Sequence, residues 1–251
     1  ATTRCVTDRC DIPEALLASL REARHVCVQT GTGASAESGV PTYRDAQDGL
    51  RPRYSPQELA TPEAFLADAL LIWRWYRSRR ELVAAAQPNA GHRALVKLAG
   101  LVPRLTLITQ NVDNLHQRAG SSDVIEFHGN LFEDRCFVEN TMTDGDHTLD
   151  VPRCPECGAN LRPGVVWFGE AIPERALNES FAAATDCDVF LSVGTSSEVY
   201  PAAGLADLAR ENRALVAEIN PEPTQQAARF DLVIAAKSGT ALPKLVELLA
   251  R

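Results

Sequence analysis

Several polar side chains that could do chemistry follow short apolar runs of this 251-residue sequence. Gln110, Asn111 and Asp113 come at or just after the run LTLITQN, and His128 lies near the end of the run DVIEFHG. An imidazole with a pKa of about 6.5 accepts a proton at neutral pH, which suits a general base. A lone histidine at the end of a strand is also often structural, and the spacing alone leaves both roles open. Together the set favours a binding site with proton-transfer chemistry.

A glycine-rich segment is the second chemical feature. The segment 25–44, HVCVQTGTGASAESGVPTYR, begins with apolar, β-prone residues that end at Thr30, and Gly31 and Gly33 follow. Glycine allows positive φ and lets an anion approach the main-chain N–H groups, which predicts a turn that binds phosphate or pyrophosphate. Ala36 stands where the third glycine of the G-x-G-x-x-G fingerprint would fall, so an ordinary glycine-rich turn remains an alternative.

Composition limits the possible functions. Hydrophobic residues at 45% and charged residues at 23% are typical of a globular protein with a sizeable core. The net charge of −8 opposes non-specific binding to nucleic acid or to an anionic membrane. We find neither a membrane-spanning apolar stretch nor a signal-peptide pattern, and we expect a cytoplasmic protein that is a monomer. The seven cysteines do not form a disulfide framework, and Cys27 and Cys187 are predicted to be core residues.

The elements that must position these side chains alternate along the chain. Apolar runs at 105–111, 123–129, 188–196, 214–220 and 231–236 predict strands, and helical patterns are found at about 12–23, 61–86, 89–100, 174–184, 201–212 and 240–250. Asp11 and Glu14 have capping-box spacing, and Asn89 is the expected cap of its helix. The alternation predicts an α/β fold with a parallel sheet covered on both faces. Ligands of such sheets bind at the carboxyl ends of the strands.

Six motifs in order resemble the sirtuins, a family of NAD-dependent protein-lysine deacylases. They are GTGASAESGVPTYR (31–44), PNAGH (88–92), TQNVDNLHQRAG (109–120), EFHGN (126–130), GVVWFGE (164–170) and GTSSEVYPAA (194–203). The resemblance covers about residues 12–249 and departs from the family at Thr32, where alanine is usual. It implies one catalytic domain, 12–251, whose Rossmann-like core comprises about 12–50, 88–132 and 164–251. A helical insertion would span about 51–87, and a small zinc-ribbon-like module about 133–163.

The resemblance also implies where NAD binds. The pyrophosphate would lie on the turn 31–33, the nicotinamide near Arg44 and the residues after the second strand, and the adenosine beyond Gly194. The implied NAD-binding set is Gly31, Thr32, Gly33, Ala34, Ala36, Glu37, Pro41, Thr42, Tyr43, Arg44, Gln110, Asn111, Val112, Asp113, Gly194, Thr195, Ser196, Asn220, Pro221, Glu222 and Ser238. Asp113 would accept a hydrogen bond from the carboxamide, although a charge at a helix N-terminus is the other interpretation.

The implied catalytic residues are His128, Asn111 and Arg44. In the family's mechanism the acyl-lysine oxygen displaces nicotinamide at the ribose carbon, and a base then activates a ribose hydroxyl. Nicotinamide, free lysine and O-acyl-ADP-ribose are the products. His128 would be that base, whereas His92 and His116 are expected to be structural or to support the site.

The segment GVVWFGE would bind an acyl-lysine peptide or protein as an added strand. Its implied contacts are Val165, Val166, Trp167, Phe168, Gly169 and Glu170, although the apolar members could instead be core. Tyr76 and Arg79 share a helix face and resemble the Tyr-x-x-Arg signature of sirtuins that remove succinyl and malonyl groups. Ala46 fits the roomier acyl pocket of that class. The alternative is a solvated basic face formed by Arg74, Arg77, Arg79 and Arg80, with Tyr76 in the core.

The family's structural zinc site is incomplete in this sequence. Sirtuins usually use two Cys-x-x-Cys pairs, and here Cys154 and Cys157 form one pair while Cys136 is followed by Glu139 in place of the fourth cysteine. Zinc would be held by the three cysteines with Glu139, a nearby aspartate or His147 as fourth ligand, or the module would stand without metal.

Other functions remain open at this stage. The same NAD chemistry fits an ordinary deacetylase or a mono-ADP-ribosyltransferase, and a non-enzymatic NAD-binding or acyl-lysine-binding module is the third possibility. Transfer of labelled ADP-ribose to protein would favour the second, and absence of turnover would favour the third.

Overall fold

The structure, a computed structural model, describes residues 10–41 and 56–251. The predictions made for Thr42, Tyr43, Arg44 and Ala46 therefore lie outside the described residues. Within the described ranges, no helix is long and apolar enough to cross a membrane.

A six-stranded parallel sheet forms the base of the molecule, in the order β3-β2-β1-β6-β7-β8. The strands are β1 Val26–Thr30, β2 Leu105–Thr109, β3 Ile125–Glu126, β6 Val189–Val193, β7 Leu215–Asn220 and β8 Leu232–Ala235. The predicted parallel sheet is confirmed. The run 123–129 is shorter than expected, since only Ile125 and Glu126 pair with β2 and Gly129 already belongs to the next strand.

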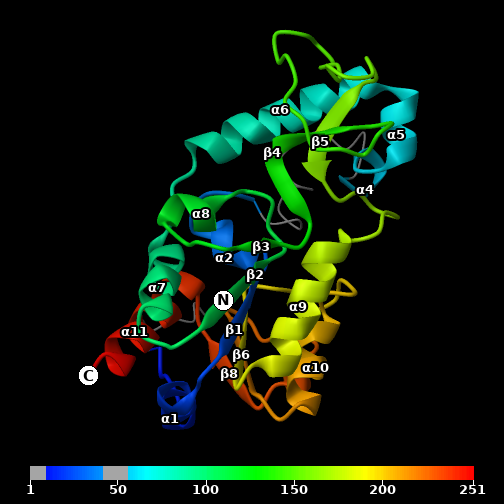
Figure 1. The fold of residues 1–251 in the computed structure, drawn as a ribbon. Helices are drawn as coiled ribbons and strands as arrows, with labels where there is room; N and C mark the ends of the chain where they lie inside the picture. The colour runs from blue at the N-terminus through cyan, green and yellow to red at the C-terminus, as the bar shows by residue number, and fades with distance from the viewer. Residues whose placement is uncertain (1–9, 42–55) are drawn as a thin grey trace, which may run out of the picture.

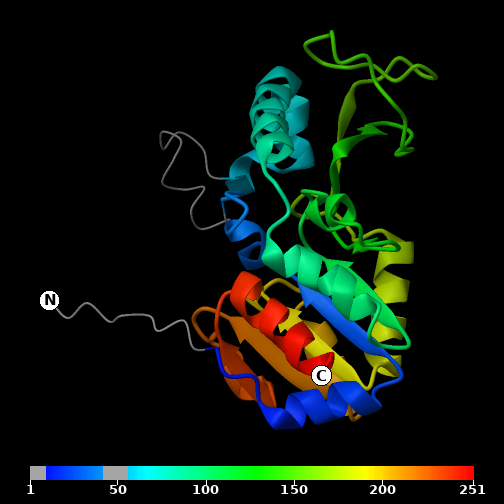
Figure 2. The same cartoon turned by 90° about the vertical axis from the view of Figure 1, so that its left-hand side faces the viewer.

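Helices cover both faces of the sheet, as Figures 1 and 2 show. Alternate strand residues point to opposite faces, so Val28 joins the cluster with α1, α7 and α11, whereas Cys27 joins the cluster with α9 and α10. The helices are α1 Glu14–Glu22, α7 Ala90–Ala99, α9 Glu174–Asp186, α10 Gly204–Glu211 and α11 Ser238–Leu249. Cys27 and Cys187 are buried core residues, as predicted.

The two predicted helix caps have different outcomes. Asn89 caps α7 as expected, because its Oδ1 accepts hydrogen bonds from the backbone N–H groups of Gly91 at 2.9 Å and His92 at 3.2 Å. The capping box at Asp11 is wrong. Helix α1 follows Pro13, which has no side-chain oxygen to accept a hydrogen bond, and it begins at Glu14.

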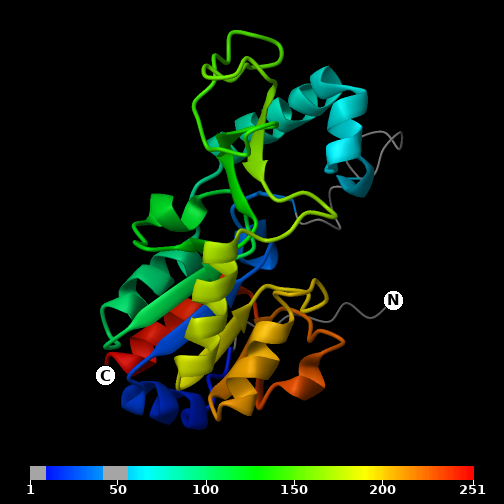
Figure 3. The same cartoon turned by 45° about the vertical axis from the view of Figure 1, so that its right-hand side comes forward.

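A second, smaller unit lies beyond the carboxyl ends of the sheet strands (Figure 3). It contains α4 Pro56–Leu59, α5 Pro62–Ala67 and α6 Ala69–Ala85, and the antiparallel pair β4 Gly129–Cys136 and β5 Leu161–Val165. The short α2 Gly33–Ala36, α8 Leu115–Ala119 and the 3-10 turn Ala227–Arg229 complete the described elements.

The single helix predicted over 61–86 is wrong, because it breaks at Asp68. Asp68 leaves the helical region at φ −154° and ψ 83°, and its Oδ1 accepts a hydrogen bond from Leu71 N at 2.9 Å to start α6. A short polar side chain such as that of aspartate can bond to nearby backbone N–H groups in place of the helical hydrogen bonds, which interrupts the helix. Thr61 caps α5 by accepting from Ala64 N at 3.1 Å. The bend separates α5 from α6, and both helices contribute residues to the apolar core of the smaller unit.

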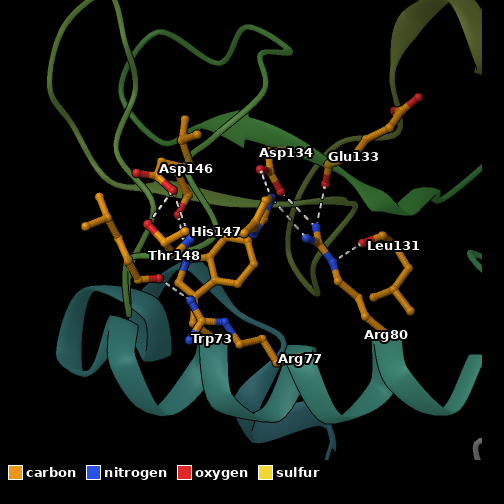
Figure 4. A network of polar contacts seen from close by, with 11 residues as sticks. Trp73, Arg77, Arg80, Leu131, Glu133, Asp134, Asp146, His147 and Thr148 are labelled. Carbon is orange, nitrogen blue, oxygen red and sulfur yellow. Dashed lines mark hydrogen bonds and ion pairs between the residues drawn. The ribbon is translucent and has the colours of Figure 1, made fainter. Parts of the chain in front are cut away.

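Helix α6 is fixed to the β4–β5 pair by a polar cluster around Arg80, shown in Figure 4. The Arg80 guanidinium donates to the carbonyls of Leu131 at 2.6 Å and Glu133 at 3.0 Å, and to Asp134 Oδ1 at 2.8 Å. His147 Nε2 lies 2.7 Å from the other oxygen of Asp134. The side chain of Asp134 is 2% exposed, so this ion pair is shielded from water. The cluster holds the helix, the strand and the loop after β4 together.

Removing the carboxylate of this cluster is expected to destabilise the protein. Asp134→Ala leaves the guanidinium of Arg80 in a poorly hydrated place without its counter-charge, which costs about 3 kcal/mol of unfolding free energy. Chemical denaturation of the two proteins measures the difference. Glu133→Ala is the matched control, because Glu133 is exposed and its backbone carbonyl is retained; it should change stability by no more than about 0.5 kcal/mol. Equal stabilities for Asp134→Ala and the control would contradict this prediction.

Candidate active site

The turns after β1 and β6 meet backbone to backbone. Gly31 N donates to Val193 O at 3.0 Å, and Gly33 N donates to Gly194 O at 2.8 Å. A Cβ atom on Gly33 would lie 2.8 Å from Gly194 Cα, and Gly194 itself has φ +61°. The close approach therefore requires glycine at both places. It brings the glycine-rich turn and the GTSS segment to one edge of the sheet, as the sequence predicted.

A buried polar chain lies behind this turn. Asn111 Nδ2 donates to Gly31 O and to Ser35 Oγ, both at 3.0 Å. Ser35 Oγ in turn donates to Asp113 Oδ2 at 2.7 Å, and Asp113 Oδ1 accepts from Leu115 N at 3.0 Å. The last contact fits the helix-start interpretation of Asp113. Asn111 Oδ1 is buried without a protein partner among the described residues, so one acceptor of the chain is available to a ligand.

Ser35 is a site residue that the sequence reasoning missed. The predicted set included its neighbours Ala34 and Ala36 but not the serine, although its hydroxyl links Asn111 to Asp113. A hydroxyl inside a turn of small residues was the available signal. The distance from 35 to 111 along the chain hid the link, because it depends on the β1–β2 pairing.

Two buried histidines, His92 and His116, pack beside these hydrogen-bonded residues. His116 Nε2 lies 2.8 Å from Thr30 Oγ1, and the ring of His116 packs against His92 with centroids 4.7 Å apart. Burial, with a smaller contribution from His92, lowers the pKa of His116 to about 3. Burial also lowers the pKa of His92. Both rings are therefore neutral at pH 7 and belong to the packed support of the site.

His128 lies at the edge of the site, on the turn into β4. Its Nδ1 is 3.1 Å from the carbonyl oxygen of Gln110, which can only accept, so Nδ1 carries the proton and Nε2 keeps a lone pair. Burial lowers the pKa of His128, and the bond to Gln110 opposes this shift weakly. Gln110 Nε2 also donates to Thr195 Oγ1 at 3.3 Å. The imidazole is thus oriented and neutral, as a general base must be.

The opposite end of the edge is formed by β7 and α11. Asn220 Nδ2 donates to Thr195 O at 2.8 Å, and Gly239 N donates to Glu37 Oε2 at 2.8 Å beside Ser238. The predicted NAD-binding residues that are described divide by exposure: Gly31, Ala34, Asn111, Asp113, Gly194, Thr195 and Ser238 are buried, Gly33, Pro41, Gln110, Val112, Ser196 and Asn220 are intermediate, and Thr32, Ala36, Glu37, Pro221 and Glu222 are exposed. The set spans the whole edge.

The segment 164–170 starts beside the histidine. Val166 N donates to His128 O at 2.8 Å, and Gly129, at φ +78°, lies so close to Gly164 O that a Cβ atom there would clash at 2.1 Å. Val165, which ends β5, is buried, Val166 is half-buried and Gly169 is exposed. These contacts join the segment to the turn that carries His128.

Trp167 and Phe168, both among the implied peptide contacts, are placed differently. Trp167 is 2% exposed and packs on Phe65, whereas Phe168 is 46% exposed and its N–H donates to Ala60 O. Glu170 forms an ion pair with Arg162 and accepts from Trp167 N at 2.7 Å, which shapes the turn.

Helix α6 contributes Tyr76 and Arg79. Trp167 Nε1 donates to the buried Tyr76 Oη at 2.8 Å, and the half-buried Arg79 lies over the ring of Trp75 at 5.2 Å from its centroid. The alternative of a solvated basic face with Tyr76 in the core holds for Tyr76, which is 4% exposed and packs in the core of the smaller unit, but not for Arg80. Arg80 is held in the cluster of Figure 4, and Arg77 pairs with Asp150 at 3.7 Å.

Comparison with known proteins gives a consistent result. The model of the Sir2 family matches residues 31–201. The chain belongs to the Sir2 family. It is 46% identical over 242 residues to NAD-dependent protein deacylase 1 of Pseudomonas aeruginosa, covering 92% of this chain and 97% of that protein. It is 45% identical over 251 residues to the NAD-dependent protein deacylase of Methylococcus capsulatus, covering 96% and 98%.

The solved structures agree. A crystal structure of a Sir2 homologue in complex with NAD superimposes with a TM-score of 0.90 at 40% identity, covering 96% of this chain and 95% of that one. The match extends over the sheet and the smaller unit, so the protein is a Sir2-family enzyme with the Sir2 fold.

The smaller unit of this Sir2 enzyme carries a cysteine cluster. The sulfur atoms of Cys136, Cys154 and Cys157 lie within 4.8 Å of one another, and those of Cys136 and Cys157 are 3.5 Å apart. Three thiolates at these distances fit a structural zinc ion. His147, one of the predicted fourth ligands, is not part of the cluster, because it is bound to Asp134 and packs edge-on against Trp73.

The buried histidine gives a pH-dependent contribution to stability. The pKa of His116 is about 3 in the folded protein against 6.5 ordinarily, so between these values the unfolded chain binds a proton that the folded chain does not. Acid therefore favours unfolding, and this group alone lowers stability by up to about 1.4 kcal/mol per pH unit below 6.5.

Unfolding free energies measured between pH 7 and pH 4 test this for the wild type and for His116→Gln, whose amide can keep the bond to Thr30. The variant should lose part of the pH dependence, because its amide does not titrate. Parallel curves would show that His116 does not titrate in this way.

Proposed function

We propose that this Sir2-family enzyme is an NAD-dependent protein-lysine deacylase that prefers acidic acyl groups, succinyl and malonyl, and removes acetyl more weakly. The products are nicotinamide, free lysine and O-acyl-ADP-ribose. The observation that supports this acyl preference is the hydrogen bond from Trp167 to Tyr76, because it joins the helix with the Tyr-x-x-Arg signature to the segment 164–170.

The edge of the sheet fits NAD. The N–H groups of Gly31 and Gly33 donate to Val193 O and Gly194 O, so these glycines fix the turn against β6, and the pyrophosphate is proposed to lie on the other side of the turn. The unpartnered Asn111 Oδ1 offers an acceptor beside this turn. When bound, NAD supplies an electrophilic ribose carbon with nicotinamide as its leaving group. Arg44, which lies outside the described residues, is proposed to complete this end of the site.

His128 is proposed to accept the proton of a ribose hydroxyl at Nε2. Its Nδ1–H is held by the Gln110 carbonyl, which fixes the neutral tautomer with the lone pair on the other nitrogen. Asn111 holds the turn through Gly31 O and orients the ligand with its remaining oxygen. The buried pair His92 and His116 keeps this framework rigid.

An acyl-lysine peptide is proposed to add along the segment 164–170, its backbone paired with the main chain and its lysine stem directed toward His128. Tyr76 and Arg79 would then bind the terminal carboxylate of the acyl group, because a guanidinium fork and a phenol together provide charge-assisted hydrogen bonds. Among the described residues, no carboxylate forms an ion pair with Arg79. Ala46, outside the described residues, is proposed to leave space for the longer acyl chain.

The acyl preference predicts a selective effect of Arg79→Met. Because the lost contact is a charge-assisted hydrogen bond, kcat/KM for a succinyl-lysine peptide should fall by about a hundredfold. The value for the acetyl-lysine form of the same peptide should stay within about threefold.

Arg74→Met is the matched control, because Arg74 is an exposed arginine of the same helix. It should leave both rates unchanged. If the wild type prefers acetyl-lysine and Arg79→Met behaves like the control, the enzyme is an ordinary deacetylase.

The catalytic role of His128 predicts a pH profile. Protonation removes the lone pair, and the pKa of His128 is lowered from 6.5, so the acid limb of kcat/KM should have its midpoint below pH 6.5. His128→Asn should reduce turnover by about a hundredfold or more and keep NAD binding, measured by calorimetry. A midpoint above pH 6.5, or a variant that retains turnover, would remove His128 from this role.

A further inference from the structure

The cysteine cluster occupies three corners of a zinc site. Cys136 ends β4, and Cys154 and Cys157 bracket the turn that follows Arg153. Tetrahedral zinc with Zn–S bonds of about 2.3 Å places its sulfur ligands about 3.8 Å apart. The observed 3.5 Å between the sulfurs of Cys136 and Cys157 is close to that value. A single ion therefore fits among the three sulfurs without rearrangement of the turns.

The fourth corner lies at the surface. Glu139 stands where a second Cys-x-x-Cys pair would end, and its backbone N–H donates to Cys136 Sγ at 3.4 Å. Its side chain is exposed, and its carboxylate is not among the grouped ligand atoms. Cys157 is exposed too, whereas Cys136 and Cys154 are buried. The open side of the cluster thus faces water.

His147 and a nearby aspartate, two predicted alternatives for the fourth ligand, are engaged elsewhere. His147 and Asp134 bind each other at 2.7 Å, and Asp134 also binds Arg80. Both belong to the polar cluster that attaches α6 to β4 (Figure 4). Among the described residues, the grouped ligand atoms are those of Cys136, Cys154 and Cys157.

We propose that Cys136, Cys154 and Cys157 bind Zn²⁺ through three thiolates and leave its fourth position open, where water or a small exogenous thiolate binds. A closed structural zinc site has four protein ligands, whereas three protein ligands and an exchangeable fourth are typical of zinc that remains accessible. The ion of this enzyme is therefore accessible to small soft ligands from solution.

The smaller unit has contacts that do not need the metal. The ring of Phe65 packs on Phe137 at 5.0 Å between centroids, and Trp73 Nε1 donates to Leu161 O at 2.8 Å. Together with the Arg80 cluster, these contacts hold the unit when the ion exchanges. We therefore expect that metal binding can be measured on the folded 251-residue protein.

Cobalt substitution tests the proposal. The reduced protein is loaded with Co²⁺ and titrated with 2-mercaptoethanol, while the sulfur-to-cobalt charge-transfer absorption and the ligand-field bands are recorded. The wild type should gain a fourth Co–S bond, seen as increased charge-transfer absorption. Glu139→Cys should have the stronger absorption before thiol is added, should not respond to it, and should bind Co²⁺ about tenfold more tightly or better.

Glu139→Gln is the matched control and separates the proposal from a carboxylate ligand. It should give the wild-type spectrum, the wild-type response to thiol and the wild-type Co²⁺ affinity. A changed spectrum or a tenfold weaker affinity for Glu139→Gln would make Glu139 the fourth ligand and overturn the open site. A wild type that fails to bind Co²⁺, or that binds it without responding to thiol, would overturn it as well.

Discussion

The contact between the glycine-rich turn and Gly194 is the constraint on which the site depends. Gly33 N bonds to Gly194 O, and the two backbones approach so closely that a Cβ atom fits on neither side. The parallel pairing of β2, β1 and β6 places these turns at one edge, and the contact then fixes their separation. Asn111 is attached to this turn by its hydrogen bond to Gly31 O.

His128, the proposed general base, is positioned by the same edge and by the smaller unit together. Gln110, which follows β2, orients the His128 ring, while Gly129 and Val166 join its turn to the segment 164–170. Burial lowers the pKa of His128 and keeps it neutral, and an imidazole with a fixed tautomer needs little reorganisation before it accepts a proton. Orientation and neutrality thus have different structural sources.

The smaller unit combines two kinds of stabilisation. Its apolar core, with Trp73, Phe65 and Trp167, buries large aromatic surfaces, while the Arg80 cluster specifies how α6 sits on β4. Because Tyr76 and Arg79 belong to α6, the packing of α6 on β4 determines where they lie. Cys136 and Cys154, two of the three clustered cysteines, are buried in the same core.

The sequence by itself determined the parallel sheet, the order of its turns and most of the candidate site. Apolar periodicity and the six motifs are local signals, and each strand end carried its polar residues within a few positions. Local signals were less reliable where side chains compete with the backbone. Asp68 breaks a helix that the periodicity joined, and Pro13 replaces the expected cap at Asp11.

Only the tertiary structure decided which distant groups meet. Ser35 is hydrogen-bonded to Asn111 and Asp113. Tyr76 accepts a hydrogen bond from Trp167, and Arg80 forms an ion pair with Asp134. It also excluded His147 as a zinc ligand by binding it to Asp134. These contacts join residues far apart in the chain, and their geometry depends on how helices and strands pack, which no short segment of sequence encodes.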